Sequence, residues 1–358
     1  MKLNKLIALL LAAAMLFAFV GCPSGNDPEN PVDNSGSTTP STPAEDPLKD
    51  VADIKDGLIG GSEAVGTEGE EGYVPAVEAV KEYKITDVEG LKKLAEIVNG
   101  KAAVEAVGTE GEEGYVPGSE AVPANSLAGY TITVANDITI NEAVLKEGFL
   151  EPDEGENGTA NPNLVNLDSI GSRKIPFCGT FDGNNKIISG LYIFQAHQGL
   201  GFIGSVGDGA VVKNVILRDA CVINANLSGA ADGSDDDRFG LLIGSSEYTE
   251  GAVTIENCIV EGVIGSEAAK NRVVEGATGD QPYEYASGIL GEVGKSGSTI
   301  VITIKNCIVF ARNYTGADKL IVNKERVKAT QENNTQYTID DLEAGKAAID
   351  AAVEAARK

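Results

Sequence analysis

The chain has 358 residues, no Trp, one His and an aromatic content of 5%, and its formal net charge is −26 at pH 7. So acidic a chain lacks the clustered Lys and Arg that bind phosphates, which excludes nucleic acids and anionic lipid headgroups as partners. Its 43 glycines predict a fold with many turns.

Residues 1–21 predict a secretory signal peptide. Lys2 and Lys5 form a basic start, a long apolar run follows, and a small residue ends the segment. This order is typical of export signals, and its length and flanks do not fit a retained membrane-spanning helix.

The end of this segment, Phe19-Val20-Gly21-Cys22, resembles the lipobox of bacterial lipoproteins, with Phe19 where that family usually has Leu. The resemblance implies cleavage before Cys22, lipidation of Cys22, and a lipid-anchored, extracytoplasmic protein of the outer membrane or cell surface. Several acyl chains make such an anchor stable. The alternative is an ordinary signal peptide that leaves Cys22 free.

Residues 22–50 predict a disordered linker after the lipidated Cys22. The segment is rich in Pro, Ser, Thr, Asn and Asp and has almost no large apolar residues. It cannot bury enough apolar surface to offset chain entropy, so we expect a flexible tether.

Residues 51–123 contain a duplication. Ala64–Pro75 and Ala106–Pro117 both read AVGTEGEEGYVP. A structural repeat keeps its pattern while its letters drift, so two identical copies indicate a recently copied acidic insert. We expect the two copies to be disordered loops without a function, and the alternative is a surface segment with ligand or antigenic sites.

A short helix lies between the two copies. Thr86 and Glu89 form a capping-box pattern, and Gly100 ends the helix. One apolar stripe follows helical spacing. It consists of Val88, Leu91, Leu94, Ala95 and Val98.

Extended chain follows. Tyr130–Ile140 alternates apolar and polar residues around a break at Asn136-Asp137, and Phe177–Ile193 reads as strand, turn, strand, turn, strand. Asp182-Gly183-Asn184-Asn185 is the first turn, so we expect Asp182 to bind local amides and not to act in catalysis. Gly179 and Gly190 indicate places where backbone passes close to backbone.

Two short elements recur downstream at spacings of about 40–50 residues, a range typical of solenoid repeats. They are Gly201–Gly204, Leu241–Gly244 and Gly288–Gly291, and then Lys213–Ile216, Glu256–Ile259 and Lys305–Ile308. Short strands, Gly turns and no helical period predict an all-β fold, a short right-handed parallel β-helix over residues 124–322. Phe177–Ile193 is then its first complete turn, ahead of three repeated coils.

The segments Ile85–Gly100, Leu127–Ile140 and Ile170–Ile193 resemble, in this order, the entry region of bacterial cell-surface β-helix proteins with GLUG-type repeats. The resemblance covers about Ile85–Asn313. Asn185 stands where that family usually has Gly. The resemblance implies the β-helix architecture and carries no activity.

Aligned repeats place Asn214, Asn257 and Asn306 at one position and Cys258 and Cys307 at another, where Val215 also falls. We expect an Asn ladder or turn hydrogen bonds along the stack, with a row of ligand-binding Asn as the alternative. The two cysteines are expected to be buried small hydrophobes, with a Cys258–Cys307 disulfide as the alternative.

Two further features draw attention. The carboxylate cluster Asp232–Asp237 has the oxygen ligands that Ca²⁺ takes, although a solvated loop is the simpler interpretation. His197 has no evident Ser, Cys or metal partner and is interpreted as a surface residue.

Residues 323–358 predict a linker and a C-terminal helix. Thr338 to Asp341 is cap-like, and one face carries Ile339, Leu342, Ile349, Val353 and Ala356. We expect this helix to cap the open end of the β-helix, and the alternative is that it docks on a partner.

These observations predict a non-enzymatic envelope protein for adhesion or surface interaction, with a glycan, host or envelope partner. No catalytic, cofactor-binding or metal-binding residue is predicted, and no cofactor. The alternatives are a polysaccharide-degrading β-helix enzyme and a carbohydrate-binding module. The coils show no carboxylates paired at matching positions, and the arginines Arg218, Arg238, Arg272 and Arg312 are scattered. Exposed aromatics would be limited to Tyr192, Tyr248, Tyr283 and Tyr285.

Overall fold

The computed structural model describes part of the chain, all of it within the compact unit Thr42–Lys358. The described residues are 82–103, 106, 124–146, 159–195, 199–224, 238–246, 250–266, 286–294, 297–314 and 319–358.

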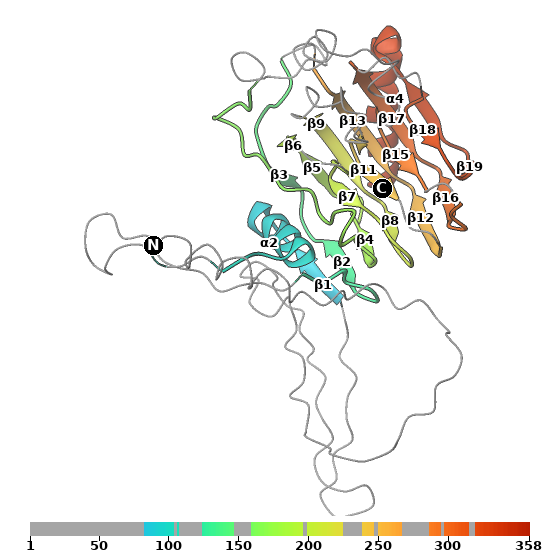
Figure 1. The fold of residues 1–358 in the computed structure, drawn as a ribbon. Coiled ribbons are helices and arrows are strands. Elements are labelled where there is room, and N and C mark those ends of the chain that lie inside the picture. Colours follow the sequence, from blue (N-terminus) through green and yellow to red (C-terminus); the bar gives the residue numbers. More distant parts are fainter. Residues whose placement is uncertain are drawn as a thin grey trace, which may run out of the picture. The chain divides into compact units, whose positions relative to one another are not determined.

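The described part consists mainly of parallel β-sheets with few helices (Figure 1). The first sheet, in spatial order, is β1 (Glu82–Ile85), β2 (Thr131–Val134), β4 (Thr180–Asp182), β8 (Val211–Lys213), β12 (Ala252–Glu256), β16 (Val301–Lys305) and β19 (Thr330–Glu332). The second is β3 (Ile138–Thr139), β5 (Ile187–Ser189), β9 (Ile216–Asn224), β13 (Ile259–Ile264), β17 (Ile308–Asn313) and β20 (Thr335–Tyr337), and β6 (Tyr192–Gln195) also pairs with β9. The third is β7 (Ile203–Ser205), β11 (Ile243–Ser246), β15 (Leu290–Val293) and β18 (Val322–Glu325). A small pair is formed by β10 (Phe239–Gly240) and β14 (Ala286–Ser287).

The chain visits the three sheets in a fixed rotation. It passes from β4 to β5 and β7, returns to the first sheet at β8, and continues through β9 and β11 to β12. Each passage, called a round below, adds one strand beside its predecessor, so all neighbours run parallel. This confirms the predicted all-β class.

The rotation begins before Phe177–Ile193. β2 and β3 already occupy the first and second sheets, and Ile170 forms a parallel bridge to Ile203 at the edge of the third. This earlier round has strands in two sheets only, so the first round with a strand in each of the three sheets is β4, β5 and β7, which begins within Phe177–Ile193.

The core lies between the sheets. In the first sheet, Phe181, Val212, Ile255 and Ile304 form one in-register row and are all buried. Burial of such a side chain contributes roughly 1.5–3 kcal/mol. The strands therefore alternate buried and less buried residues, as in the five-residue strands β12 and β16.

Helix α2 (Val88–Asn99) lies beside β1 and β2 (Figure 1) and buries the predicted stripe except for Val88, which is half-buried. Its N-cap differs from the prediction: Asp87, not Thr86, is the capping residue, and its carboxylate accepts from the Gly90 N–H at 3.0 Å. The extended backbone of Asp87 moves the start of the helix one residue along. Gly100, with φ of 75°, ends it as predicted.

The C-terminal helix corrects another expectation. After a 3₁₀ turn (Ile339–Asp341), α4 (Leu342–Ala356) packs across the outer face of the second sheet and does not cap the end of the stack. Thr338 makes no side-chain cap bond. The predicted apolar face is confirmed, and its cluster contains Ile216, Ile259, Val263, Phe310, Ile349 and Val353.

The length of α4 matches the width of the part of the second sheet that it crosses. Its 15 residues span about 22 Å at ~1.5 Å per residue. Four strand steps from β17 to β3 cover about 19 Å. Accordingly, Arg357 just beyond α4 reaches Asp137 just before β3, with Nη2 and Oδ2 separated by 2.8 Å.

In the last round, polar residues take the positions that core residues occupy in the earlier rounds. Gln331 and Gln336 follow Ile304 and Val309 in the inward rows of the first and second sheets. All three residues of β19 are exposed. Polar terminal repeats are what a stacked fold needs at an end that faces water. Within the described ranges, no helix combines the length and apolarity needed to cross a membrane.

Candidate functional site

Asparagines mark the corner between the first and second sheets. Asn214, Asn257, Asn306 and Asn333 have φ of 53°, 54°, 54° and 52°. Asn tolerates this left-handed conformation better than most residues, because its short polar side chain can bond locally. Asn184 and Asn185 also have positive φ, the pattern of a type I′ turn, which explains why Asn185 can replace Gly.

The four asparagines, called the asparagine row, form a ladder across rounds. Nδ2 of each residue donates to Oδ1 of the one before it: Asn257 to Asn214 at 3.3 Å, Asn306 to Asn257 at 3.2 Å, and Asn333 to Asn306 at 3.4 Å. The predicted Asn ladder is confirmed, and Asn333 is a member that the sequence did not reveal.

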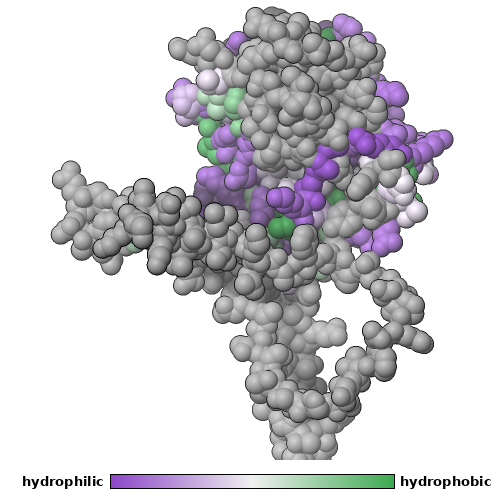
Figure 2. Space-filling view, viewed as in Figure 1, coloured by the Kyte–Doolittle hydropathy of each residue, from purple (hydrophilic) through white to green (hydrophobic). Residues whose placement is uncertain are grey.

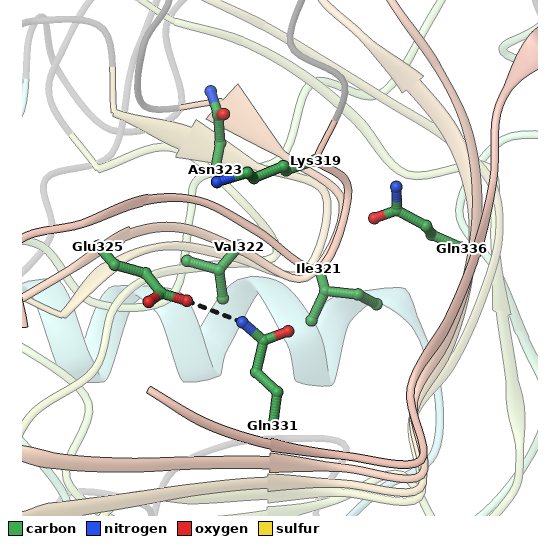
Figure 3. Close-up of a pocket in the computed structure, with 7 residues that line it drawn as sticks. All are labelled: Lys319, Ile321, Val322, Asn323, Glu325, Gln331 and Gln336. Atoms are coloured by element: carbon green, nitrogen blue, oxygen red, sulfur yellow. Dashed lines mark hydrogen bonds between the residues drawn. The ribbon is translucent and has the colours of Figure 1, made fainter. Parts of the chain in front are cut away.

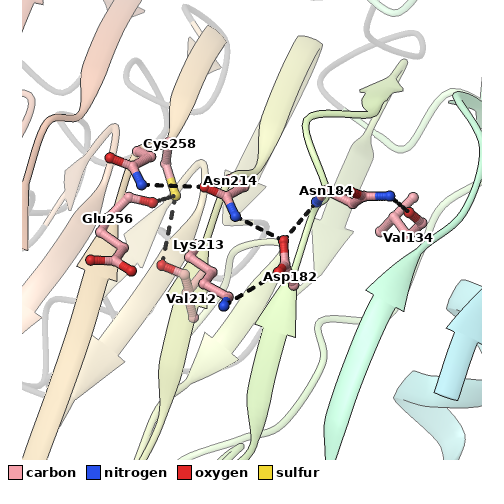
Figure 4. Close-up of polar contacts among 9 residues, drawn as sticks. Val134, Asp182, Asn184, Val212, Lys213, Asn214, Glu256 and Cys258 are labelled. Carbon is pink, nitrogen blue, oxygen red and sulfur yellow. Dashed lines mark hydrogen bonds and ion pairs between the residues drawn. The ribbon is translucent and has the colours of Figure 1, made fainter. Parts of the chain in front are cut away.

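Asp182 stands at the head of this ladder (Figure 4). Its Oδ1 accepts from the Asn184 N–H at 2.8 Å, as expected of a turn residue, and from Nδ2 of Asn214 at 3.0 Å. Its Oδ2 lies 3.4 Å from Nζ of Lys213. The cross-round partners were not predicted.

Next to the asparagine row runs a row of alternating charge, called the charge row. Its in-register members are Asp182, Lys213, Glu256, Lys305 and Glu332. Nζ of Lys305 lies 2.8 Å from Oε2 of Glu256, and this hydrogen bond raises the pKa of Lys305. Opposite charges on neighbouring strands favour this register. The signal was present, since each member from Lys213 onward directly precedes an asparagine of the ladder.

Arginines that look scattered in the sequence join glutamates of other rounds. Arg238 and Glu292 are both buried and form an ion pair, and Nε of Arg326 lies 2.6 Å from Oε1 of Glu292. Buried ions need such partners, because losing one partner leaves an uncompensated charge.

A second cluster links the sheet to α4. Arg218 pairs with Glu261, and its Nη2 lies 3.1 Å from Oδ1 of Asp350 in α4. Burial raises the pKa of the neighbouring Asp219, although its carboxylate accepts backbone N–H groups at 2.9 and 3.2 Å. These groups act in packing and register.

Four cysteines are described, and all are buried and outside any disulfide. Cys258 and Cys307 lie in the core at the position of Val215, which confirms the predicted buried thiols. Sγ of Cys258 lies 3.3 Å from the Glu256 carbonyl oxygen, and Sγ of Cys307 lies 3.4 Å from that of Lys305.

A pocket of about 400 Å³ lies where the last round ends (Figure 3). Glu325 and Gln331 point toward each other, and Nε2 of Gln331 donates to Oε1 of Glu325 at 2.8 Å. Oε1 of Gln336 accepts from the Leu320 N–H at 2.9 Å. Ile321 and Val322 also line the pocket and add apolar surface to it. Such a lining can hydrogen-bond hydroxyl groups.

The surface of the described residues is otherwise mainly polar. Figure 2 shows one face, on which the described residues are mainly hydrophilic and hydrophobic ones form small patches. Among the described large hydrophobic residues, only Val301 is exposed, at 59%. Tyr192 is buried and its hydroxyl accepts from the Asn161 N–H at 3.0 Å, so it offers no stacking face for a sugar.

Several predicted features lie outside the described residues. They are Cys22, His197, the cluster Asp232–Asp237, Tyr248, Tyr283, Tyr285, Arg272 and both inserts, apart from Ala106. In the part of the chain that is described, no three or more His, Cys, Asp or Glu residues are grouped so that they could hold a metal ion.

Comparison with known proteins gives no relative. No family model matches the chain, and no curated protein or solved structure matches it either.

Proposed function

We propose that this chain is a lipid-anchored, extracytoplasmic protein of the bacterial envelope that acts by surface interaction and not by catalysis. The observation that carries the proposal is the sequence Phe19-Val20-Gly21-Cys22 after an export-like segment and before a Pro/Ser/Thr-rich tether. A tether of this composition holds a folded part away from the membrane.

The folded part of the proposal is a right-handed parallel β-helix of the kind found in cell-surface proteins with GLUG-type repeats. The rotation of strands through three parallel sheets supports it. The asparagine row supports it as well, because such a ladder needs one equivalent turn per round.

Non-catalytic action is supported by the partners of three described carboxylates. Asp182, Glu256 and Glu292 each pair with a Lys or Arg from another round. A glycan-cleaving site requires an acid and a second carboxylate directed at one bond. Carboxylates held in structural pairs are poorly placed for that work.

The anchor is tested by growing cells with labelled palmitate and isolating the protein. We expect label in the natural chain and in Phe19→Leu, which restores the usual lipobox residue, and no label in Cys22→Ala. Label that persists in Cys22→Ala would overturn the assignment, as would an unlabelled natural chain.

A carbohydrate-binding function is the second candidate, and the amide-lined pocket favours it. A glycan array on the mature chain decides between the two. Saturable binding that Gln331→Ala abolishes and Asn163→Ala leaves intact would establish the carbohydrate-binding module, since Asn163 is exposed and outside the pocket lining. Turnover of any arrayed glycan would refute non-catalytic action.

A further inference from the structure

Cys258 and Cys307 occupy equivalent positions in successive rounds. Each follows an asparagine with φ of 54°, so the backbone has the same conformation at both sites. Hydrogen bonds tie the rounds together on both sides of the pair. Nδ2 of Asn306 donates to Oδ1 of Asn257 at 3.2 Å, and the Ile308 N–H donates to the Cys258 carbonyl oxygen at 2.9 Å.

The separation of such neighbours suits a covalent link. Paired residues of adjacent parallel strands lie about 4.8 Å apart. Disulfides join cysteines whose Cα atoms are about 4.4–6.8 Å apart. Both thiols contact the carbonyl oxygen two residues back, and Sγ of Cys258 also lies 3.8 Å from the Val212 carbonyl oxygen of the preceding round. Rotation about the Cα–Cβ bond of Cys258 turns its sulfur from Val212 toward Cys307.

The other described cysteines have no such neighbour. Cys221 is in register with Tyr192 on one side and Val263 on the other. The N–H of Cys178 bonds to the Ser126 carbonyl oxygen, in a different part of the fold. Adjacent rounds therefore bring together one described pair of thiols, Cys258 with Cys307.

We propose that Cys258 and Cys307 are a modification site, at which a disulfide joins the fourth round (β12, β13 and β15) to the fifth (β16, β17 and β18). The oxidant is a disulfide donor of the thiol–disulfide exchange class. One cysteine thiolate attacks the donor, forms a mixed disulfide and releases one donor thiol. The second cysteine displaces the other donor thiol. Two cysteine thiols are oxidised and one donor disulfide is reduced to two thiols.

Access of the donor decides when the bond can form. Because both thiols are buried, the donor must reach them before β19 and β20 close over Cys307. The bond then forms during folding.

The test is refolding of the full chain from denaturant with oxidised and reduced glutathione. Free thiols are then alkylated in denaturant, and the peptides are analysed by mass spectrometry. We expect a linked pair of peptides that contain Cys258 and Cys307, lighter by two hydrogens, and a lower melting temperature after reduction. Cys258→Val and Cys307→Val remove both effects, and Val is the residue found at position 215 of the preceding round. Cys221→Ala is the matched control and keeps both.

Alkylation of both cysteines after oxidative refolding would overturn the proposal, as would a bond from either one to another cysteine. An equal effect of reduction on Cys258→Val would also overturn it. Formation of the bond in cells rests on the proposed export, but refolding does not. A failed palmitate experiment and a failed refolding experiment are therefore distinguishable.

Discussion

The outer faces of the first and second sheets cross the same rounds but carry different kinds of side chain. On its outer side, beside the charge row, the first sheet carries Thr131, Thr180, Thr254 and Thr303, with Val211 in the same row and Val301 near its end as apolar exceptions. The second sheet shows large apolar residues, which α4 covers. The same repeating backbone thus has a mainly polar outer face on the first sheet, where opposite charges pair, and an apolar outer face on the second sheet, where α4 packs.

The comparison indicates which face is available to partners. The apolar face is already occupied within the chain, with Gly345 of α4 so near Phe310 that an added Cβ would lie 2.5 Å from its ring. The described Thr and charge-row residues of the polar face are half-buried or exposed, and the charge row and the asparagine row set its register. We propose that surface interaction, if it uses the repeated strands, uses the first sheet.

The largest effect is expected from Gly183→Val, which breaks the corner between the two faces. A Cβ at this position would lie 2.4 Å from the Asn214 carbonyl oxygen and 2.6 Å from Cα of Val215. We expect loss of the folded state, seen as loss of the cooperative unfolding transition by circular dichroism. The neighbouring Asp182→Asn is the control and should stay folded. A Gly183→Val chain that unfolds like the natural one would contradict the close packing of rounds.

The next effect concerns the covered face. Ile349→Ala removes a buried side chain from the interface between α4 and the second sheet. We expect a loss of about 2–4 kcal/mol in the free energy of unfolding, measured in urea. Ala351→Ser on the exposed side of α4 is the control. Equal effects of the two substitutions would mean that α4 does not pack as described.

A smaller effect separates the two roles of Asn257 in the asparagine row, which are its left-handed backbone and its ladder hydrogen bonds. Asn257→Gly keeps the left-handed turn but removes two ladder bonds, so we expect a loss of about 1 kcal/mol. Asn257→Ala adds the cost of left-handed backbone and should lose about 1–2 kcal/mol more. Urea unfolding of both variants measures the difference. If Ala proves less harmful than Gly, the backbone conformation is not what selects Asn here.

The smallest effect is electrostatic and tests the far end of α4. Burial acts to raise the pKa of Asp137, but the Ile187 N–H and Arg357 outweigh it and lower the pKa. A carboxyl with a lowered folded-state pKa stabilises the fold above its unfolded pKa, and this stabilisation is lost as pH falls through the folded pKa. The stability difference between the natural chain and Asp137→Asn should therefore be constant near neutral pH and vanish in acid. A difference that grows in acid has the wrong sign for this contact.

Local patterns revealed much of this structure. Alternating residues predicted β2 and β3, the stripe predicted the buried side of α2, and repeated Lys-Asn and Glu-Asn pairs predicted the ladder. These features depend on neighbours in sequence or on one recurring turn, so a single chain displays them.

The missed features depend on register or on distant contacts. The turn after Asp182 is two residues longer than the turn after Lys213, although the two residues are in register. The sequence alone therefore did not align Asp182 with the charge row. The apolar stripe of α4 shows that it packs, but not on which surface. Arg238 and Glu292 lie more than 50 residues apart, and no local signal links them.

Hydrogen exchange tests the contrast between the two faces most directly. Peptide exchange rates are compared between the full chain and a chain that ends at Tyr337, which lacks α4. The account predicts faster exchange in β9, β13 and β17 of the second sheet and unchanged exchange in β8, β12 and β16 of the first. Equal acceleration in both sheets, or none in either, would contradict it.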